Sequence, residues 1–166
     1  TVFTPILRGI DPGLEARVAK GLPVSGIASV ASFFVSRIDA AVAQRAEQRI
    51  AAGASTDEKQ RLQALNAKVA IANAKVAYAR FLDDLGAARW RKLAAAGADP
   101  QRVLWASTGT KDPALPKTLY VDELIGKYTV NTVPDATLAA FRIEGKVRDA
   151  LGSDPGRLDR EAKAVL

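Results

Sequence analysis

ASVASFFVSRID, at residues 28–39, is an unbroken run of small and apolar side chains that stops at Ser36-Arg37 and leads into a helical pattern. A strand that is apolar on both faces is typical of the middle of a parallel sheet, where both sides are covered. The carboxyl ends of such strands are where α/β sheets and barrels bind their ligands. The stretch therefore predicts a buried parallel strand with a polar end that faces a ligand.

Arg37, at the end of this strand, allows two interpretations. Its guanidinium offers a planar fork of donors that matches the oxygens of a phosphate, which favours an anion site. Alternatively, Arg37 caps the sheet and pairs with a surface carboxylate such as Asp39, two residues further on. Composition alone does not separate the binding role from the structural one.

Two further apolar runs resemble the first. RVLWAS, at 102–107, is followed by Thr108-Gly109-Thr110-Lys111, and YTVNTV, at 128–133, stops at Pro134. Helical periodicity fills the intervals between the runs. It is strongest over 57–84, where a capping box formed by Ser55 and Glu58 precedes the helix. Other helices are expected at 14–20, 37–52, 87–96, 120–125, 135–145 and 154–166, and a short strand at 1–8.

Strands that alternate with helices predict an α/β fold with parallel strands. We expect the strands at 28–35, 102–107 and 128–133 to lie adjacent to one another in that order. The length of 166 residues, with 48% apolar and 25% charged residues, is typical of a single globular domain over 1–166.

The composition also excludes several classes of function. The chain contains neither Cys nor His, which excludes disulfides, the usual zinc ligands and Ser-His or Cys-His catalysis within it. The net charge is +6, but basic residues alternate with acidic ones along the predicted helices, so we expect no nucleic-acid partner.

No apolar run approaches the length of a membrane span, so we expect no membrane partner. The opening, TVFTPILRG, lacks both a secretory signal and an initiator Met, so we expect a processed, cleaved or partial chain.

Three separated segments match one known family in order and spacing. They are GLPVSGIASVASFFVSRID at 21–39, NAKVAIANAKVAYARF at 66–81 and LWASTGTKDPALPKTLYVDELIGKYTVNTVPDATLAAF at 104–141. With these segments, residues 14–150 resemble the transaldolase family, closest to the bacterial form that is sometimes fused to a glucose-phosphate isomerase. Transaldolases are (β/α)8 TIM barrels of the pentose phosphate pathway. They transfer a dihydroxyacetone unit between phosphorylated sugars through a lysine Schiff base. The resemblance implies a sugar-phosphate substrate, a cytoplasmic location and neither cofactor nor metal.

The resemblance also implies roles for individual residues. Ser32 is similar to the family serine in the active site on the sixth strand, and Phe34 to its aromatic neighbour in the pocket. Arg37 looks like the arginine that binds the substrate phosphate. Ser107 and Lys111 look like the rest of the phosphate site, on and after the seventh strand. We therefore expect Arg37, Ser107 and Lys111 to converge on one anion site.

The catalytic part of the family pattern is missing. The family's Schiff-base lysine lies on the fourth strand, in a segment ending Lys-Ile-Pro or Lys-Ile-Ala, and its acidic residues come from the first and third strands. No such segment occurs here, so the chain resembles the second half of the barrel, with 1–8 as a candidate fifth strand. Lys111 is no substitute, because a Schiff-base lysine must be neutral and this one lies in a polar loop. We predict no catalytic residue in this chain and no activity of the isolated chain.

Two functions remain after this comparison. In the first, the chain supplies the substrate-phosphate side of a transaldolase, and a second chain or a missing segment carries the other half of the barrel. The protein is then a transferase only together with that half. In the alternative, the chain is a non-catalytic half-barrel fragment that binds phosphate or serves only a structural role. Three ordered matches argue against an unrelated basic α/β binding module.

Overall fold

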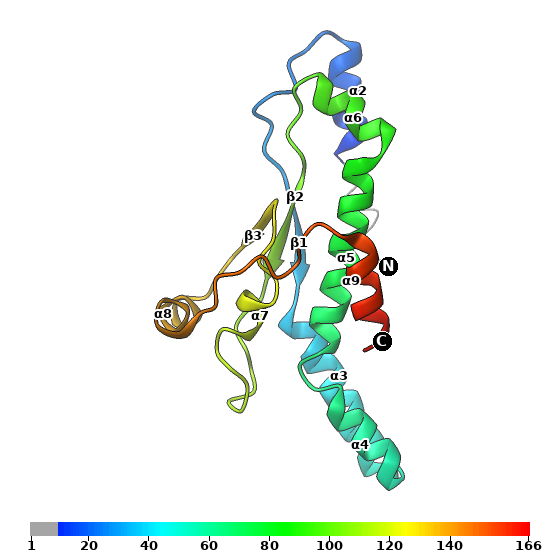
Figure 1. The fold of residues 1–166 in the computed structure, drawn as a ribbon, viewed down its shortest axis with the longest axis vertical. Helices are drawn as coiled ribbons and strands as arrows, with labels where there is room; N and C mark the ends of the chain where they lie inside the picture. The colour runs from blue at the N-terminus through cyan, green and yellow to red at the C-terminus, as the bar shows by residue number, and fades with distance from the viewer. Residues whose placement is uncertain (1–9) are drawn as a thin grey trace.

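The centre of the molecule is a three-stranded parallel sheet (Figure 1), seen in a computed structural model that describes residues 10–166. The strands are β1 (Val30–Phe34), β2 (Arg102–Ala106) and β3 (Thr129–Asn131), in that order across the sheet. Both pairs of neighbours are parallel. The predicted strand order and the α/β class are therefore confirmed. The strand predicted at 1–8 falls outside the described residues.

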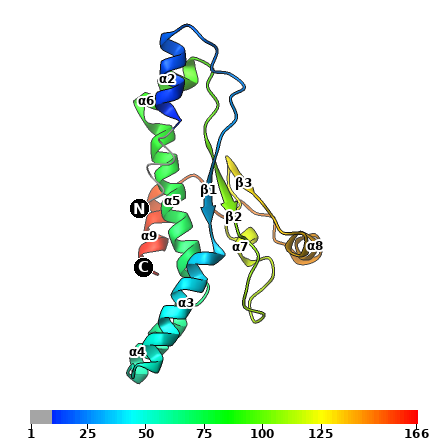
Figure 2. The ribbon, with the colours of Figure 1, turned by 180° about the vertical axis from the view of Figure 1, so that it is seen from behind.

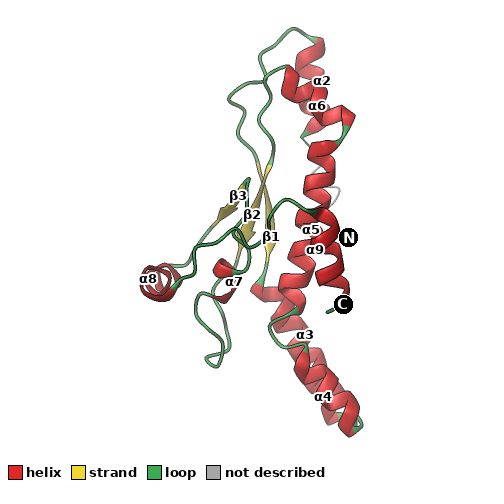
Figure 3. Ribbon diagram, viewed as in Figure 1, coloured by secondary structure: helices red, strands yellow, loops and turns green. Residues whose placement is uncertain are grey.

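Helices flank the strands, and most of them lie near the places that the sequence predicted (Figure 3). Their bounds are α2 (Asp11–Ala19), α3 (Ser36–Ala51), α4 (Thr56–Ala64), α5 (Val69–Gly86), α6 (Ala88–Ala95), α7 (Leu119–Asp122), α8 (Asp135–Glu144) and α9 (Pro155–Lys163). The Ser55 hydroxyl accepts a hydrogen bond from the Glu58 N–H at 3.2 Å, which confirms the predicted cap of α4. The Glu58 carboxylate bonds the Arg49 guanidinium, with Nε and Oε1 2.6 Å apart, and so joins α4 to α3.

The prediction of one helix over 57–84 is wrong, because the chain leaves helical geometry at 65–68, between α4 and α5. Ala67 has a φ of 59°, a left-handed conformation that costs a residue other than glycine roughly 1–2 kcal/mol. The break frees the start of α5, where the Ala70 N–H donates to the Asp39 carboxylate at 2.8 Å. Periodicity missed the turn because Leu62, Leu65 and Val69 keep helical spacing across it.

One face of the sheet forms the core. Figures 1 and 2 show α5 lying along the sheet. It contacts the face that carries Phe33, Val103 and Trp105, which are all buried. On the other face, Val30 and Phe34 are 41% and 45% exposed. The expectation that β1 is buried on both faces is therefore wrong within residues 10–166, where helices cover the sheet from one side.

Helices α2 to α6 and α9 form an elongated layer beside the sheet, whereas Figures 1 and 2 show α8 away from this layer, across the sheet. Figure 2 shows the α3–α4 hairpin extending beyond one end of α5, and α2 and α6 beyond the other. A second, smaller core joins α2 to α6 through Leu14, Val24, Leu93 and Ala98. Among the described helices, none is long and apolar enough to cross a membrane.

Gly126, in the turn before β3, lies unusually close to the chain segment that leads to α9. A Cβ atom built on Gly126 would lie 2.9 Å from both Cβ and Cδ1 of Leu151. The Leu151 side chain is fully buried, and its N–H donates to the Ile125 carbonyl at 3.0 Å. Because Leu151 is held by both packing and a backbone hydrogen bond, it cannot move away from a larger residue at position 126.

We predict that Gly126→Ala lowers the free energy of unfolding by about 1–3 kcal/mol, the usual cost of an extra methyl group in a packed site. Gly13→Ala is the matched control, because an added Cβ there has no neighbour within 4 Å. In α2 this control should leave stability unchanged or raise it by up to about 1 kcal/mol. Urea unfolding followed by circular dichroism measures both variants. Equal stability of Gly126→Ala and the wild type would contradict the packing described.

Candidate functional site

Arg37 lies in the first turn of α3, directly beyond the carboxyl end of β1. Its guanidinium carbon is 4.2 Å from the centroid of the Phe34 ring, which is a cation–π contact. Both side chains are exposed, and Phe34 belongs to the open face of the sheet together with Ser32, two residues earlier. The aromatic ring therefore lies against the guanidinium of Arg37.

Ser107 reaches the same place from β2. Its carbonyl accepts a hydrogen bond from the Ser36 N–H at 3.1 Å. This bond continues the pairing of the two strands by one step beyond the bond from Val35 N–H to the Ala106 carbonyl, at 2.9 Å. Ser107 has a φ of 58°, and this left-handed conformation turns the chain out of the strand. The structure therefore places Ser107 beside the first turn of α3.

Lys111 lies in the loop that follows Ser107, and its side chain is exposed. It helps to line a pocket of about 360 Å³, together with Ser36, Asp39 and Tyr120. Arg37 is not among the described residues that line this pocket. The structure thus brings Lys111 to the α3 terminus but not into the same pocket as Arg37. The convergence of Arg37, Ser107 and Lys111 on one anion stays a prediction.

Asp39 is not the surface carboxylate that the structural interpretation of Arg37 requires. It is 8% exposed, and both of its oxygens are engaged. Oδ1 accepts from the Ala70 N–H at 2.8 Å, and Oδ2 accepts from the Tyr120 hydroxyl at 2.7 Å. Within residues 10–166, no ion pair of Arg37 is found. Arg37 is therefore held by an aromatic ring rather than by the acid near it in sequence.

The link between Asp39 and Tyr120 is the part of the site that sequence reasoning missed. The two residues are 81 positions apart, and Ala70 is 31 positions from Asp39, so no local pattern connects them. Burial is the largest cause that raises the pKa of the Tyr120 phenol, followed by its hydrogen bond to Asp39. Tyr120 therefore remains a neutral donor. The one available signal was an acidic residue, Asp39, at the third position of the helix predicted over 37–52.

The first turn of α3 has the chemistry of an anion site. The amino end of a 16-residue helix carries the positive end of its dipole. Two of its first N–H groups, those of Ser36 and Ile38, already donate to the carbonyls of Ser107 and Val35. Arg37 adds a fixed positive charge at this end. Glu47 and Asp112 line the pocket on the Lys111 side, so their carboxylates oppose an anion there. The Arg37–Phe34 side is therefore the more favourable place for a phosphate.

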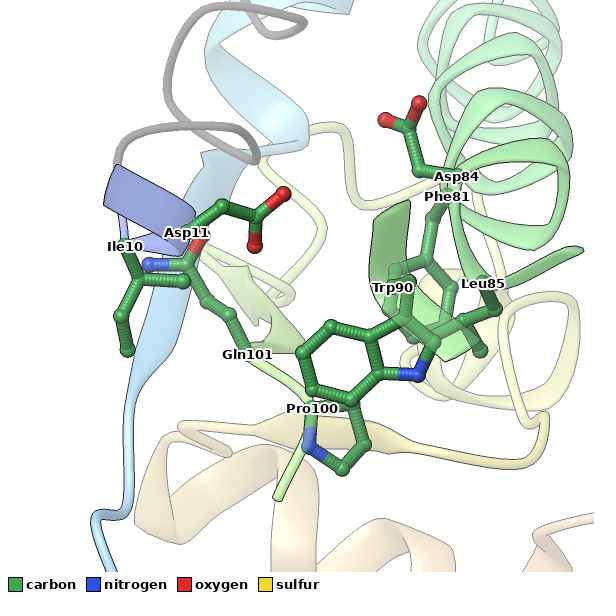
Figure 4. Close-up of a pocket in the computed structure, with 8 residues that line it drawn as sticks. All are labelled: Ile10, Asp11, Phe81, Asp84, Leu85, Trp90, Pro100 and Gln101. Atoms are coloured by element: carbon green, nitrogen blue, oxygen red, sulfur yellow. The ribbon is translucent and has the colours of Figure 1, made fainter. Parts of the chain in front are cut away.

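A second cavity lies at the opposite end of the sheet. Figure 4 shows Trp90 and Gln101 among its lining residues, with the carboxylates of Asp11 and Asp84 close by. Its volume is about 30 Å³, and Gln101 directly precedes β2, so it lies at the amino ends of the strands. Ligands of α/β barrels bind at the other end. In the described part of the chain, no group of three or more Asp or Glu residues could hold a metal ion.

The comparisons with known proteins agree with this arrangement. The family model described as transaldolase/fructose-6-phosphate aldolase matches residues 13–165. The transaldolase of Frankia alni is 52% identical over 146 residues, which are 88% of this chain and 37% of that protein. The transaldolase of Trichodesmium erythraeum is 50% identical over 128 residues, which are 77% of this chain and 34% of that protein.

The chain therefore spans little more than a third of the length of these relatives. The parallel sheet with its alternating helices is what a part of the family's TIM barrel looks like. Both the fold expected from the resemblance and the resemblance itself are confirmed by the family model and by relatives at about half identity. The chain belongs to the transaldolase/fructose-6-phosphate aldolase family.

Proposed function

We propose that this chain forms the substrate-phosphate side of the active site of a transaldolase that acts on sugar phosphates. The observation that carries the proposal is the position of Arg37. It follows the carboxyl end of β1, lies over the exposed Phe34 ring, and belongs to a helix turn that is hydrogen-bonded to Ser107. A fork of donors fixed in this way, at a helix amino terminus, suits a phosphate monoester.

Each predicted residue has a role in this proposal. Arg37 binds two phosphate oxygens, and the Ser107 hydroxyl donates to a third. Lys111 approaches from the loop and adds a charge that is less constrained in direction. Ser32 and Phe34 lie on the open face of the sheet, where the sugar itself would lie. Phosphate binding then fixes the substrate's position relative to the rest of the site.

The covalent chemistry belongs to the rest of the barrel in this proposal. A Schiff-base lysine attacks the ketose carbonyl as a neutral amine, which needs burial or a cationic neighbour. Lys111 is exposed in a polar loop beside Asp112 and does not meet that need. The reacting lysine and the proton-transfer acids would lie on strands in another segment or chain, packed on the open sheet face. The pentose phosphate pathway and the cytoplasm are the setting that we infer from the family.

Arg37→Ala tests the phosphate site directly. We expect the affinity of the chain for inorganic phosphate or a ketose phosphate to fall by roughly ten- to a hundred-fold, the worth of a charged, bidentate hydrogen bond. Arg37→Lys should retain part of the affinity, because an ammonium lacks the fork. Arg45→Ala is the matched control, since it removes the same charge from an exposed position of the same helix. Isothermal titration calorimetry measures binding.

Thermal melting of the same variants separates binding from structure. The proposal expects Arg37→Ala to melt close to the wild type, because the side chain is exposed and lies at a strand end. A large loss of stability with unchanged phosphate affinity would instead assign Arg37 a structural role, and the chain would be the non-catalytic fragment of the alternative.

We further predict that the isolated chain forms no Schiff base. Incubation with a ketose phosphate and borohydride should leave its intact mass unchanged, because the described residues include no buried lysine suited to the reaction. A full-length relative carried through the same reaction is the positive control. A stable adduct on any lysine of this chain would overturn the division of roles proposed above, and peptide mapping would begin with Lys111.

A further inference from the structure

The loop that carries Lys111 is tied at both ends to the first turn of α3. This loop, residues 107–118, leaves β2 at Ser107 and enters α7 at Leu119. At its start, the Ser107 carbonyl accepts the Ser36 N–H at 3.1 Å. At its end, the Tyr120 hydroxyl donates to Asp39 Oδ2 at 2.7 Å. The two anchor points, Ser36 and Asp39, lie on either side of Arg37.

The second tie has the properties of a strong contact. Asp39 is 8% exposed and Tyr120 is 2% exposed, so water competes little with their hydrogen bond. The acceptor is a carboxylate, which makes the bond charge-assisted. The other Asp39 oxygen accepts the Ala70 N–H at 2.8 Å, so α5 holds the carboxylate in place independently of Tyr120.

Other hydrogen bonds also hold the loop, one of them from the fully buried Thr108 next to Ser107. Asp112 accepts the Ala114 N–H at 2.9 Å within the loop, and its other oxygen is 3.4 Å from the Asn66 amide nitrogen. Thr108 donates to the Asn131 side chain at 2.8 Å and so joins the loop to β3. Lys111 lies between these contacts, and its own side chain is exposed. Its position therefore depends on the anchors of the loop rather than on its own packing.

We propose that Asp39 and Tyr120 are positioning residues, which hold the Lys111 loop against the Arg37 end of α3. They act through the loop and do not touch the substrate themselves. The consequence for phosphate binding rests on the function proposed above, whereas the consequence for loop order does not.

Tyr120→Phe tests the positioning role because it removes the hydroxyl and leaves the ring and the bond from Ala70 to Asp39. We expect amide hydrogen exchange to accelerate about tenfold over 108–118, as the loss of a hydrogen bond of this kind implies, while Ala70 stays protected. Tyr78→Phe is the matched control. It removes the hydroxyl of another buried tyrosine, which donates to the Lys127 carbonyl at 2.9 Å, outside the 107–118 loop. The control should leave exchange over 108–118 unchanged.

Loop exchange that is the same in Tyr120→Phe as in the wild type, or that rises equally in both tyrosine variants, would overturn the proposal. Asp39→Asn provides a second variant should Tyr120→Phe fail to fold. It keeps a neutral hydrogen-bonding group between Ala70 and Tyr120 and should accelerate loop exchange by a smaller factor. An unchanged loop in folded Asp39→Asn would count against the proposal in the same way.

Phosphate titration adds a readout that a merely structural contact would not change. Tyr120→Phe should weaken phosphate binding about as much as Lys111→Gln does, and the double variant should bind no more weakly than either single variant. Full additivity would mean that Tyr120 does not act through Lys111, which overturns the proposal. A wild-type chain that binds no phosphate would defeat the proposed function instead, and the exchange measurement would still decide the positioning role.

Discussion

The packing of α5 between the sheet and α9 is the constraint on which the rest of the structure depends. The α5 residues that face the core include a set of buried alanines, Ala70, Ala74, Ala77 and Ala79. Their small side chains leave room for Phe33 and Trp105 of the sheet, whose rings meet edge to face at 5.6 Å. The same packing of α5 brings its first turn within hydrogen-bonding distance of Asp39. Larger residues on α5 would therefore disturb the core and the polar contacts together, because close-packed interiors transmit such changes.

Much of the fold could be predicted from the sequence, because its strongest signals are local. The apolar runs that became β1, β2 and β3 are each bounded by polar or turn residues, and most helices keep a 3.6-residue period between clear ends. Gly97, with a φ of 92°, follows the last turn of α6, as a helix-terminating glycine does. Arg37 could be proposed from its place at a strand end, but Ser32, Phe34, Ser107 and Lys111 could be named as site residues only through the resemblance to a family.

What could not be predicted depends on contacts between distant parts of the chain. The break at 65–68 follows from the position of Asp39, a residue in another helix that bonds the Ala70 N–H. The burial of Asp39 depends in turn on Tyr120, which only the folded chain brings near. The exposure of one face of β1 could not be predicted either. An apolar strand has the same sequence pattern whether the residues that cover it lie in the same segment or elsewhere. In the first two cases the partner is remote in sequence, and periodicity carries no information about remote partners.

The sheet itself has one consequence for how such a chain behaves. Among the described strands, β3 pairs with β2 alone, so its outward side carries backbone amide and carbonyl groups that no described strand satisfies. Unpaired strand sides act as templates for further strands and are a common cause of self-association. The same geometry that would let the sheet be extended into a closed barrel therefore lets one copy extend another. Closure of the sheet into a barrel, rather than the burial of any one side chain, is what would prevent strand pairing between copies of this chain.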